Sequence, residues 1–112
     1  MNDQAKTFLD LATEVEIQSG GTISKTLHQD DGLKVVLFGF DAGQELSEHT
    51  AAVPAILQFL DGDATVTLGD ETIHASTGTF VHMAANLSHS ITANTPTKML
   101  LLLLKSAKGS AK

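Results

Sequence analysis

Short apolar runs, each followed by a turn-forming residue, are the feature that most constrains how this chain can fold. Residues 22–28 (TISKTLH) and 65–68 (TVTL) alternate their side chains with the period of two that is typical of a half-buried strand. Glycine, aspartate, asparagine or proline follows such runs at short intervals, and these residues favour tight turns. The pattern predicts an all-β sandwich or barrel of about ten short antiparallel strands, without an amphipathic helix.

The turns divide the chain into a series of expected strands. They span residues 7–11, 22–28, 33–40, 55–60, 65–68, 72–74, 79–83, 89–92 and 98–105. Residues 6–17 alternate only loosely, so either a strand or a short helical turn is possible there, and we favour an edge strand over residues 7–11. The second and third strands should form a hairpin around the turn at residues 29–32. Residues 55–60 are apolar on both faces apart from Gln58, and residues 98–105 contain an unbroken run of leucines, so we expect both sides of their sheet to be covered.

Length, composition and charge restrict the class of protein. We expect 112 residues to form one domain, residues 1–112, with an N-terminal edge segment over residues 1–21 and a flexible tail over residues 106–112. With 42% hydrophobic and 18% charged residues, a packed core is expected rather than disorder. The net charge of −6 repels phosphates, so neither nucleic acid nor a membrane is expected as a partner.

The absence of cysteine, of a signal-peptide pattern and of a long apolar run restricts the possible reactions and the cellular location of the protein. The chain has no cysteine, which excludes a disulfide, a thiolate nucleophile and a cysteine-based metal site. Its start, MNDQAKTFLDLATEV, does not have the pattern of a signal peptide. The longest apolar run, residues 99–104, is far shorter than the about 20 residues of a membrane-spanning helix. We therefore expect a cytoplasmic protein.

Two glycine-led stretches, residues 43–62 and 78–94, each carry one histidine beside a β-rich apolar run. In the first, five residues separate Gly43 from His49, and a second glycine closes the stretch. The spacing of the second stretch is marked by Gly78, Ala84, Asn86, His89 and Ala93. This spacing resembles the two sequence motifs of the cupin superfamily, over about residues 33–104. The resemblance implies an all-β double-stranded β-helix, the jelly-roll-like cupin barrel.

The chain also departs from these motifs. Ala51 stands where the first motif has its second histidine, and Ala55 stands where it has a glutamate. In the second stretch, Ala84 takes a proline position and Asn86 takes a glycine position. In the family, the two histidines and the glutamate of the first motif join the histidine of the second to hold a divalent metal inside the barrel. Half of that ligand set is therefore absent here.

His49 and His89 are the candidate site residues, and three interpretations of them stay open. They form a residual metal pair that holds one divalent ion (Zn, Fe, Mn or Ni) weakly, because a catalytic site normally takes three protein ligands. Alternatively, they are pocket residues bonded to each other, to water or to backbone, or one of them is a general acid or base. In a regular strand Glu48 points away from His49, and Glu45 or Gln58 replaces a missing ligand only if a bulge re-aims it.

The remaining histidines are weaker candidates. His82 alternates with apolar neighbours and is expected on the outer face of a sheet or in an interface, whereas His74 and His28 lie near turns and are expected to be solvated. The outward-facing Ile56 and Leu60 add to the resemblance in predicting a homodimer.

Three functions follow from these residues and the resemblance. The first is a small cupin-like protein that binds a small molecule, a divalent metal or both through His49 and His89. The second is a metal-dependent dioxygenase or isomerase that acts on a small organic acid or sugar. The third is a non-enzymatic sensor or structural module. The fold alone does not choose among them.

Overall fold

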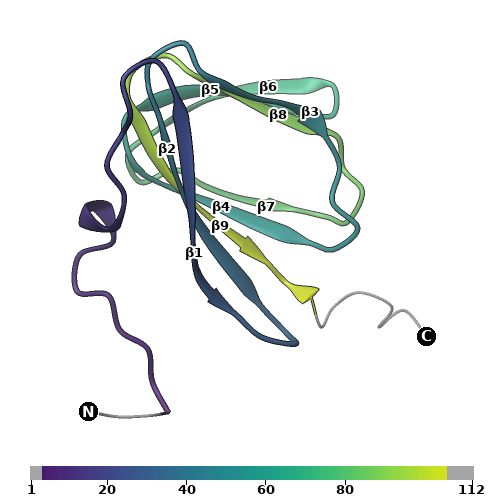
Figure 1. The fold of residues 1–112 in the computed structure, drawn as a ribbon. Coiled ribbons are helices and arrows are strands. Elements are labelled where there is room, and N and C mark those ends of the chain that lie inside the picture. The colour runs from purple at the N-terminus through teal and green to yellow at the C-terminus, as the bar shows by residue number, and fades with distance from the viewer. Residues whose placement is uncertain (1–3, 106–112) are drawn as a thin grey trace.

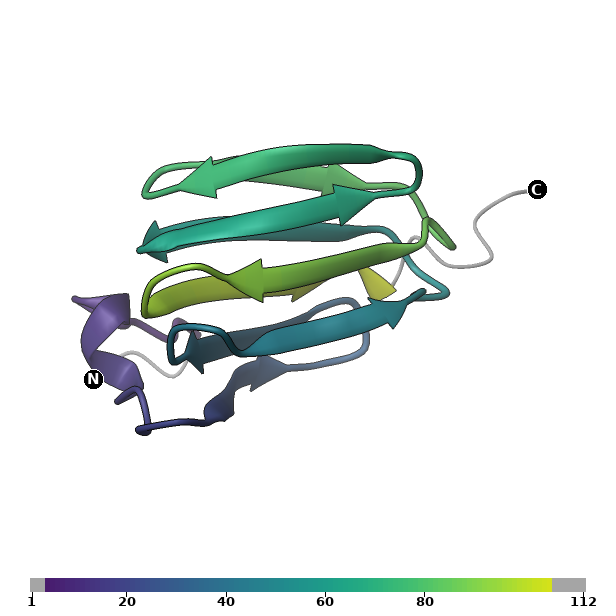
Figure 2. The same ribbon diagram turned by 90° about the horizontal axis from the view of Figure 1, so that it is seen from above.

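The computed structural model describes residues 4–105 and consists of two antiparallel sheets that face each other (Figure 1). The five-stranded sheet has the order β1 (Thr22–Gln29), β2 (Lys34–Phe40), β9 (Thr97–Leu103), β4 (Ala55–Asp61) and β7 (Phe80–Met83). The four-stranded sheet has the order β3 (Glu45–His49), β8 (His89–Ala93), β5 (Asp63–Leu68) and β6 (Glu71–Ser76) and lies in front in Figure 2. The predicted all-β double-stranded β-helix is confirmed.

The strands follow the predicted runs closely, with nine strands in the described residues where about ten were expected. The predicted hairpin is formed by β1 and β2, which pair antiparallel across the turn. The strand β3 was not among the expected strands because residues 45–49 (ELSEH) carry only one apolar side chain. The predicted flexible tail, residues 106–112, lies outside the described residues.

The favoured edge strand over residues 7–11 is wrong, and the alternative for residues 6–17, a short helical turn, is the one that forms. Residues 5–10 form no strand, and residues Leu11–Glu14 form a short 3-10 helix, η1. The physical reason is that this segment packs apolar side chains onto the sheet instead of pairing its backbone with an edge. Phe8, Leu11 and the buried Val15 pack with Leu27 and Leu37 on the outer face of the five-stranded sheet.

The main core lies between the two sheets. Its largest fully buried side chains include Phe40, Leu57, Phe59, Met83, Ile91 and Met99. The register explains this arrangement, since Val36, Leu101, Leu57 and Val81 lie opposite one another across four strands and share the inner face. The sheets are thus held together by apolar contacts, as the leucine-rich and valine-rich runs predict. In the described part of the chain, no helix has the length and hydropathy to cross a membrane.

Candidate functional site

The structure brings His49 and His89 together on neighbouring strands. His49 ends β3, His89 begins β8, and the two residues are direct partners in the register. Their imidazole centroids are 4.3 Å apart, and the ring planes are inclined by 57°. The two glycine-led stretches of the sequence therefore converge on one pair of rings.

A β-bulge in β3 places both imidazole rings on the same face of the four-stranded sheet. Leu46 is opposite Ile91 and His49 is opposite His89, so three steps along β3 match two steps along β8. In a regular strand His49 would face away from Leu46, because side chains alternate. The extra residue restores the match, and His49 lies on the inner face with His89 and the fully buried Ile91.

Backbone hydrogen bonds fix which ring nitrogen carries the proton. Nδ1 of His49 lies 2.7 Å from the carbonyl oxygen of Ser47, and Nδ1 of His89 lies 2.9 Å from that of Leu87. A carbonyl oxygen only accepts, so Nδ1–H donates in both rings. In the neutral imidazole the lone pair then lies on Nε2. Both rings are held in the tautomer that leaves Nε2 as an acceptor.

Both Nε2 atoms are open to a ligand. Neither has a hydrogen-bond partner among residues 4–105. His89 is buried, at 5% exposure. In the described residues, every fully buried side-chain nitrogen or oxygen has a hydrogen-bond partner. Because Nε2 of His89 has none, this atom is not fully buried, and the whole of His49 is exposed. The pair has one deep and one shallow acceptor.

The loop before His89 is fixed by a residue whose role the sequence only hinted at. The backbone N–H of Asn86 donates to the carbonyl oxygen of Ala51 at 2.7 Å, which ties this loop to the segment after His49. Asn86 has φ of +69°, the left-handed conformation that asparagine adopts more readily than most residues other than glycine. The sequence signal for this conformation is that Asn86 stands at a glycine position of the motif, because both asparagine and glycine adopt positive φ.

The ligands that would complete a metal centre are not supplied by nearby residues. The bulge lies at Ser47 and Glu48, yet Oε2 of Glu48 accepts a hydrogen bond from Oγ of Ser88 at 2.5 Å. Glu45 lies opposite Thr92, next to the inward-facing Ile91, and is therefore on the outer face. Across residues 4–105, no group of three histidine, aspartate or glutamate side chains is placed to hold a metal ion. The donor set does not fit a resident catalytic metal, which normally needs three protein ligands.

The second possible replacement ligand also lies on the wrong face. Gln58 is opposite Leu100 on β9 and Phe80 on β7, in a row on the outer face of the five-stranded sheet. Ala55, which stands at the glutamate position, is 2% exposed and lies opposite Met83 and Leu103. The interior beside the alanine is apolar. Metal binding by His49 and His89 stays a prediction.

The other three histidines lie away from this pair. His82 is exposed on β7, opposite Ile56 on the outer face. Nε2 of His74 is 2.7 Å from the Asp63 carboxylate, and Nε2 of His28 is 2.7 Å from that of Asp30. These two surface pairs were not expected, since sequence reasoning treated both histidines as simply solvated.

The two carboxylates in these pairs are stabilised in their charged form. Hydrogen bonds from the Asn94 side chain, and then from His74, lower the pKa of Asp63. A hydrogen bond from His28, and then one from the Gly32 backbone, lower the pKa of Asp30. Both carboxylates are at the surface, so they shape turns and strand ends rather than a reaction site.

Comparison with solved structures gives close matches over nearly the whole chain. A conserved protein of unknown function from Streptococcus pyogenes is 33% identical, with a TM-score of 0.82 over 90% of this chain and 89% of that one. A cupin superfamily protein from Desulfitobacterium hafniense is 27% identical, with a TM-score of 0.83 over 89% and 92%. An RmlC-like cupin from Desulfovibrio desulfuricans is 25% identical, with a TM-score of 0.80 over 90% and 97%. No protein-family model and no curated protein matches the chain.

Proposed function

Because this chain belongs to the cupin superfamily, we propose that it binds a small organic molecule inside the barrel, through direct contacts with His49 and His89. One observation carries the proposal: the two imidazoles are direct neighbours, each with an Nε2 acceptor that has no partner among residues 4–105, while their Nδ1–H groups are occupied by backbone carbonyls. The 4.3 Å separation of the ring centroids lets one small molecule contact both rings.

The chemistry of the two acceptors selects the kind of ligand. A neutral imidazole with its proton on Nδ1 requires a donor at Nε2, so two such rings suit a molecule with two neighbouring O–H or N–H groups. Vicinal hydroxyls on a small ring or a sugar provide this arrangement. Each hydrogen bond contributes about 0.5–1.5 kcal/mol net, so apolar contact with the surrounding core must supply the rest of the affinity.

Direct contact by the imidazoles is favoured over a metal-bridged site. Two nitrogen ligands leave a divalent ion without the carboxylate that would offset its charge in an apolar interior. Asn86 and the bulge in β3 instead position the loop and the strand that carry the two rings. A binding protein therefore agrees better with these residues than a metal-dependent dioxygenase or isomerase does.

The proposal is tested by thermal unfolding of chelator-treated protein against a panel of small cyclic diols, sugars and their monomethyl ethers. A ligand that binds only the folded state stabilises it by about 2.7 kcal/mol when present at 100 times its Kd. We expect at least one diol to raise the Tm of the parent, its monomethyl ether to be weaker, and His49→Ala and His89→Ala each to lose the effect.

The matched control is His82→Ala, which removes an exposed imidazole from the outer face of β7 and should leave the ligand-induced shift unchanged. The proposal is overturned if no donor-bearing molecule stabilises the metal-free parent. It is also overturned if the stabilisation persists in both His49→Ala and His89→Ala.

A further inference from the structure

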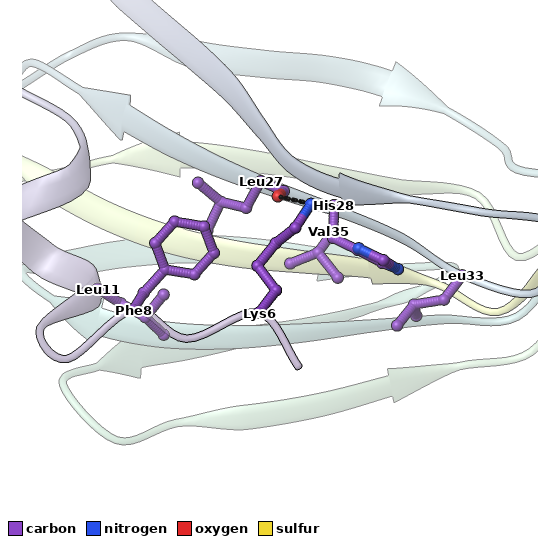
Figure 3. Close-up of a pocket in the computed structure, with 7 residues that line it drawn as sticks. All are labelled: Lys6, Phe8, Leu11, Leu27, His28, Leu33 and Val35. Atoms are coloured by element: carbon purple, nitrogen blue, oxygen red, sulfur yellow. Dashed lines mark hydrogen bonds between the residues drawn. The ribbon is translucent and has the colours of Figure 1, made fainter. Parts of the chain in front are cut away.

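A concave site lies on the outer face of the five-stranded sheet, away from the histidine pair. It is a groove of about 340 Å³ between the N-terminal segment and the β1–β2 hairpin. Its lining residues, drawn in Figure 3, are Lys6, Phe8, Leu11, Leu27, His28, Leu33 and Val35. Val35 lies on the outer face of the sheet, since it belongs to the cluster beneath the N-terminal segment. The groove and the barrel site are therefore separate.

The walls of the groove are mainly apolar. Phe8 and Leu11 come from the N-terminal segment, and Leu27 and Val35 come from the two strands of the hairpin. Lys6 links the two walls, because its Nζ donates to the carbonyl oxygen of Leu27 at 3.2 Å (Figure 3). The segment that forms one wall is thus tied to β1 at the groove itself.

The ammonium group of Lys6 gives the groove one charged feature. An ammonium has three N–H donors, and the Leu27 carbonyl takes one of them. Among residues 4–105, no carboxylate lies within 4.0 Å of this nitrogen. The carboxylate of Asp30 is occupied by His28 at 2.7 Å and by the N–H groups of Gly32 and Leu33. Within the described residues, the groove therefore pairs apolar walls with a cation that has no carboxylate partner.

We infer that this groove binds a small amphiphilic anion, a free carboxylic acid with an unbranched apolar tail. The carboxylate would accept from Lys6, and the tail would lie against Phe8, Leu33 and Val35. The volume suits a molecule of about ten non-hydrogen atoms, taking about 30 Å³ for each, and it falls at the lower end of the about 300–1,000 Å³ of small-molecule sites. Octanoate has this size and chemistry.

The test is a methyl NMR titration of the full chain with octanoate, and with octanol as the uncharged analogue of the same length. We expect octanoate to shift the methyl signals of Leu27, Leu33 and Val35 in a saturable way. Octanol should bind about tenfold more weakly, which corresponds to the loss of one charge-assisted hydrogen bond.

Two variants test the role of the charge. Lys6→Met keeps the apolar length of the side chain and should abolish the preference for octanoate, whereas Lys6→Arg should retain it. Equal binding of octanoate and octanol by the parent would overturn the inference, as would shifts confined to Ile91 and the barrel interior or no saturable shift at all. The His49→Ala variant should bind octanoate normally, so this inference and the barrel proposal fail separately.

Discussion

Backbone conformation explains why glycines occupy the motif positions in this chain, although half of the motif's metal ligands are absent. Gly43, Gly62 and Gly78 all adopt positive φ values, of +84°, +101° and +95°. L-residues are strained in this region. Gly62 carries a further constraint, since a Cβ there would lie 2.4 Å from the carbonyl oxygen of Pro96 and 2.6 Å from Oγ1 of the buried Thr97. The glycine positions of the motifs thus meet a requirement of the backbone.

Replacement of Gly62 by alanine tests this account. The left-handed backbone costs about 1–2 kcal/mol, and overpacking against Pro96 and Thr97 costs about 1–3 kcal/mol more. We expect Gly62→Ala to lose about 2–5 kcal/mol of unfolding free energy in urea. Gly43→Ala is the matched control, because a Cβ there meets no atom within 4 Å and only the backbone term remains. Equal losses in the two variants would contradict the steric argument.

The carboxylate of Asp63 makes a pH-dependent contribution to stability. Its pKa in the folded state lies below the ordinary value of 3.8, chiefly because the Asn94 side chain donates to it. The ionised Asp63 carboxylate therefore contributes fully to the free energy of unfolding above pH 3.8, and this contribution is lost as the pH falls through the lower pKa of the folded state. Urea unfolding from neutral pH to well below 3.8 should show Asp63→Asn losing less stability than the parent over this range.

The control for this pH series is Asp70→Asn. Within the described residues, the Asp70 carboxylate has no hydrogen bond or ion pair. We expect Asp70→Asn to follow the parent curve. A curve for Asp63→Asn that runs parallel to the parent through the acid range would contradict the assignment.

At the scale of elements, how well the sequence predicted the structure differed from strand to strand. The hairpin of β1 and β2 was predictable, because period-two alternation and a turn-rich linker both indicate it. The placement of His49 on the inner face was not predictable, because the bulge in β3 depends on its pairing with β8. For the N-terminal segment the sequence left a strand and a short helical turn open, and the favoured strand was wrong. Its side chains alternate only loosely, and their packing partners lie elsewhere in the chain.

The packing of the N-terminal segment on the outer face gives a second core that can be tested. Leu37 is fully buried beneath this segment, whereas Leu102 is only half-buried on the same face. We expect Leu37→Ala to lose about 2–5 kcal/mol of unfolding free energy and to speed amide hydrogen exchange across residues 5–17. Leu102→Ala should lose less and leave that exchange unchanged. Similar exchange in both variants would contradict the packing.

At the scale of the whole molecule, the outer face of the five-stranded sheet remains partly uncovered, and we propose that a second copy of the chain packs there. Phe80 on β7 is 59% exposed and Leu9 is 97% exposed. Leu9 and Leu60 of β4 line one groove of about 360 Å³, and Ile56 lies on the same face of β4. One face thus carries both projecting apolar side chains and a groove, which suits a symmetric interface.

Light scattering coupled to size exclusion tests the dimer at micromolar concentration. We expect a dimer mass for the parent, against 11.8 kDa for one chain, and a monomer for Leu9→Glu or Phe80→Glu. The control is Thr72→Glu, which adds a charge to the exposed strand β6 of the other sheet and should remain dimeric. A monomeric parent would refute the interface.

The central claim is that His49 and His89 present two ligand-accepting Nε2 atoms in the barrel. Long-range ¹H–¹⁵N correlation spectra of the imidazole nitrogens, recorded on metal-free protein with neutral rings, test it most directly. We predict a protonated Nδ1 and an unprotonated Nε2 in both residues, with the Nε2 signals moving when a stabilising diol is added. A protonated Nε2 in either ring, or Nε2 signals that ignore such a ligand, would contradict the account.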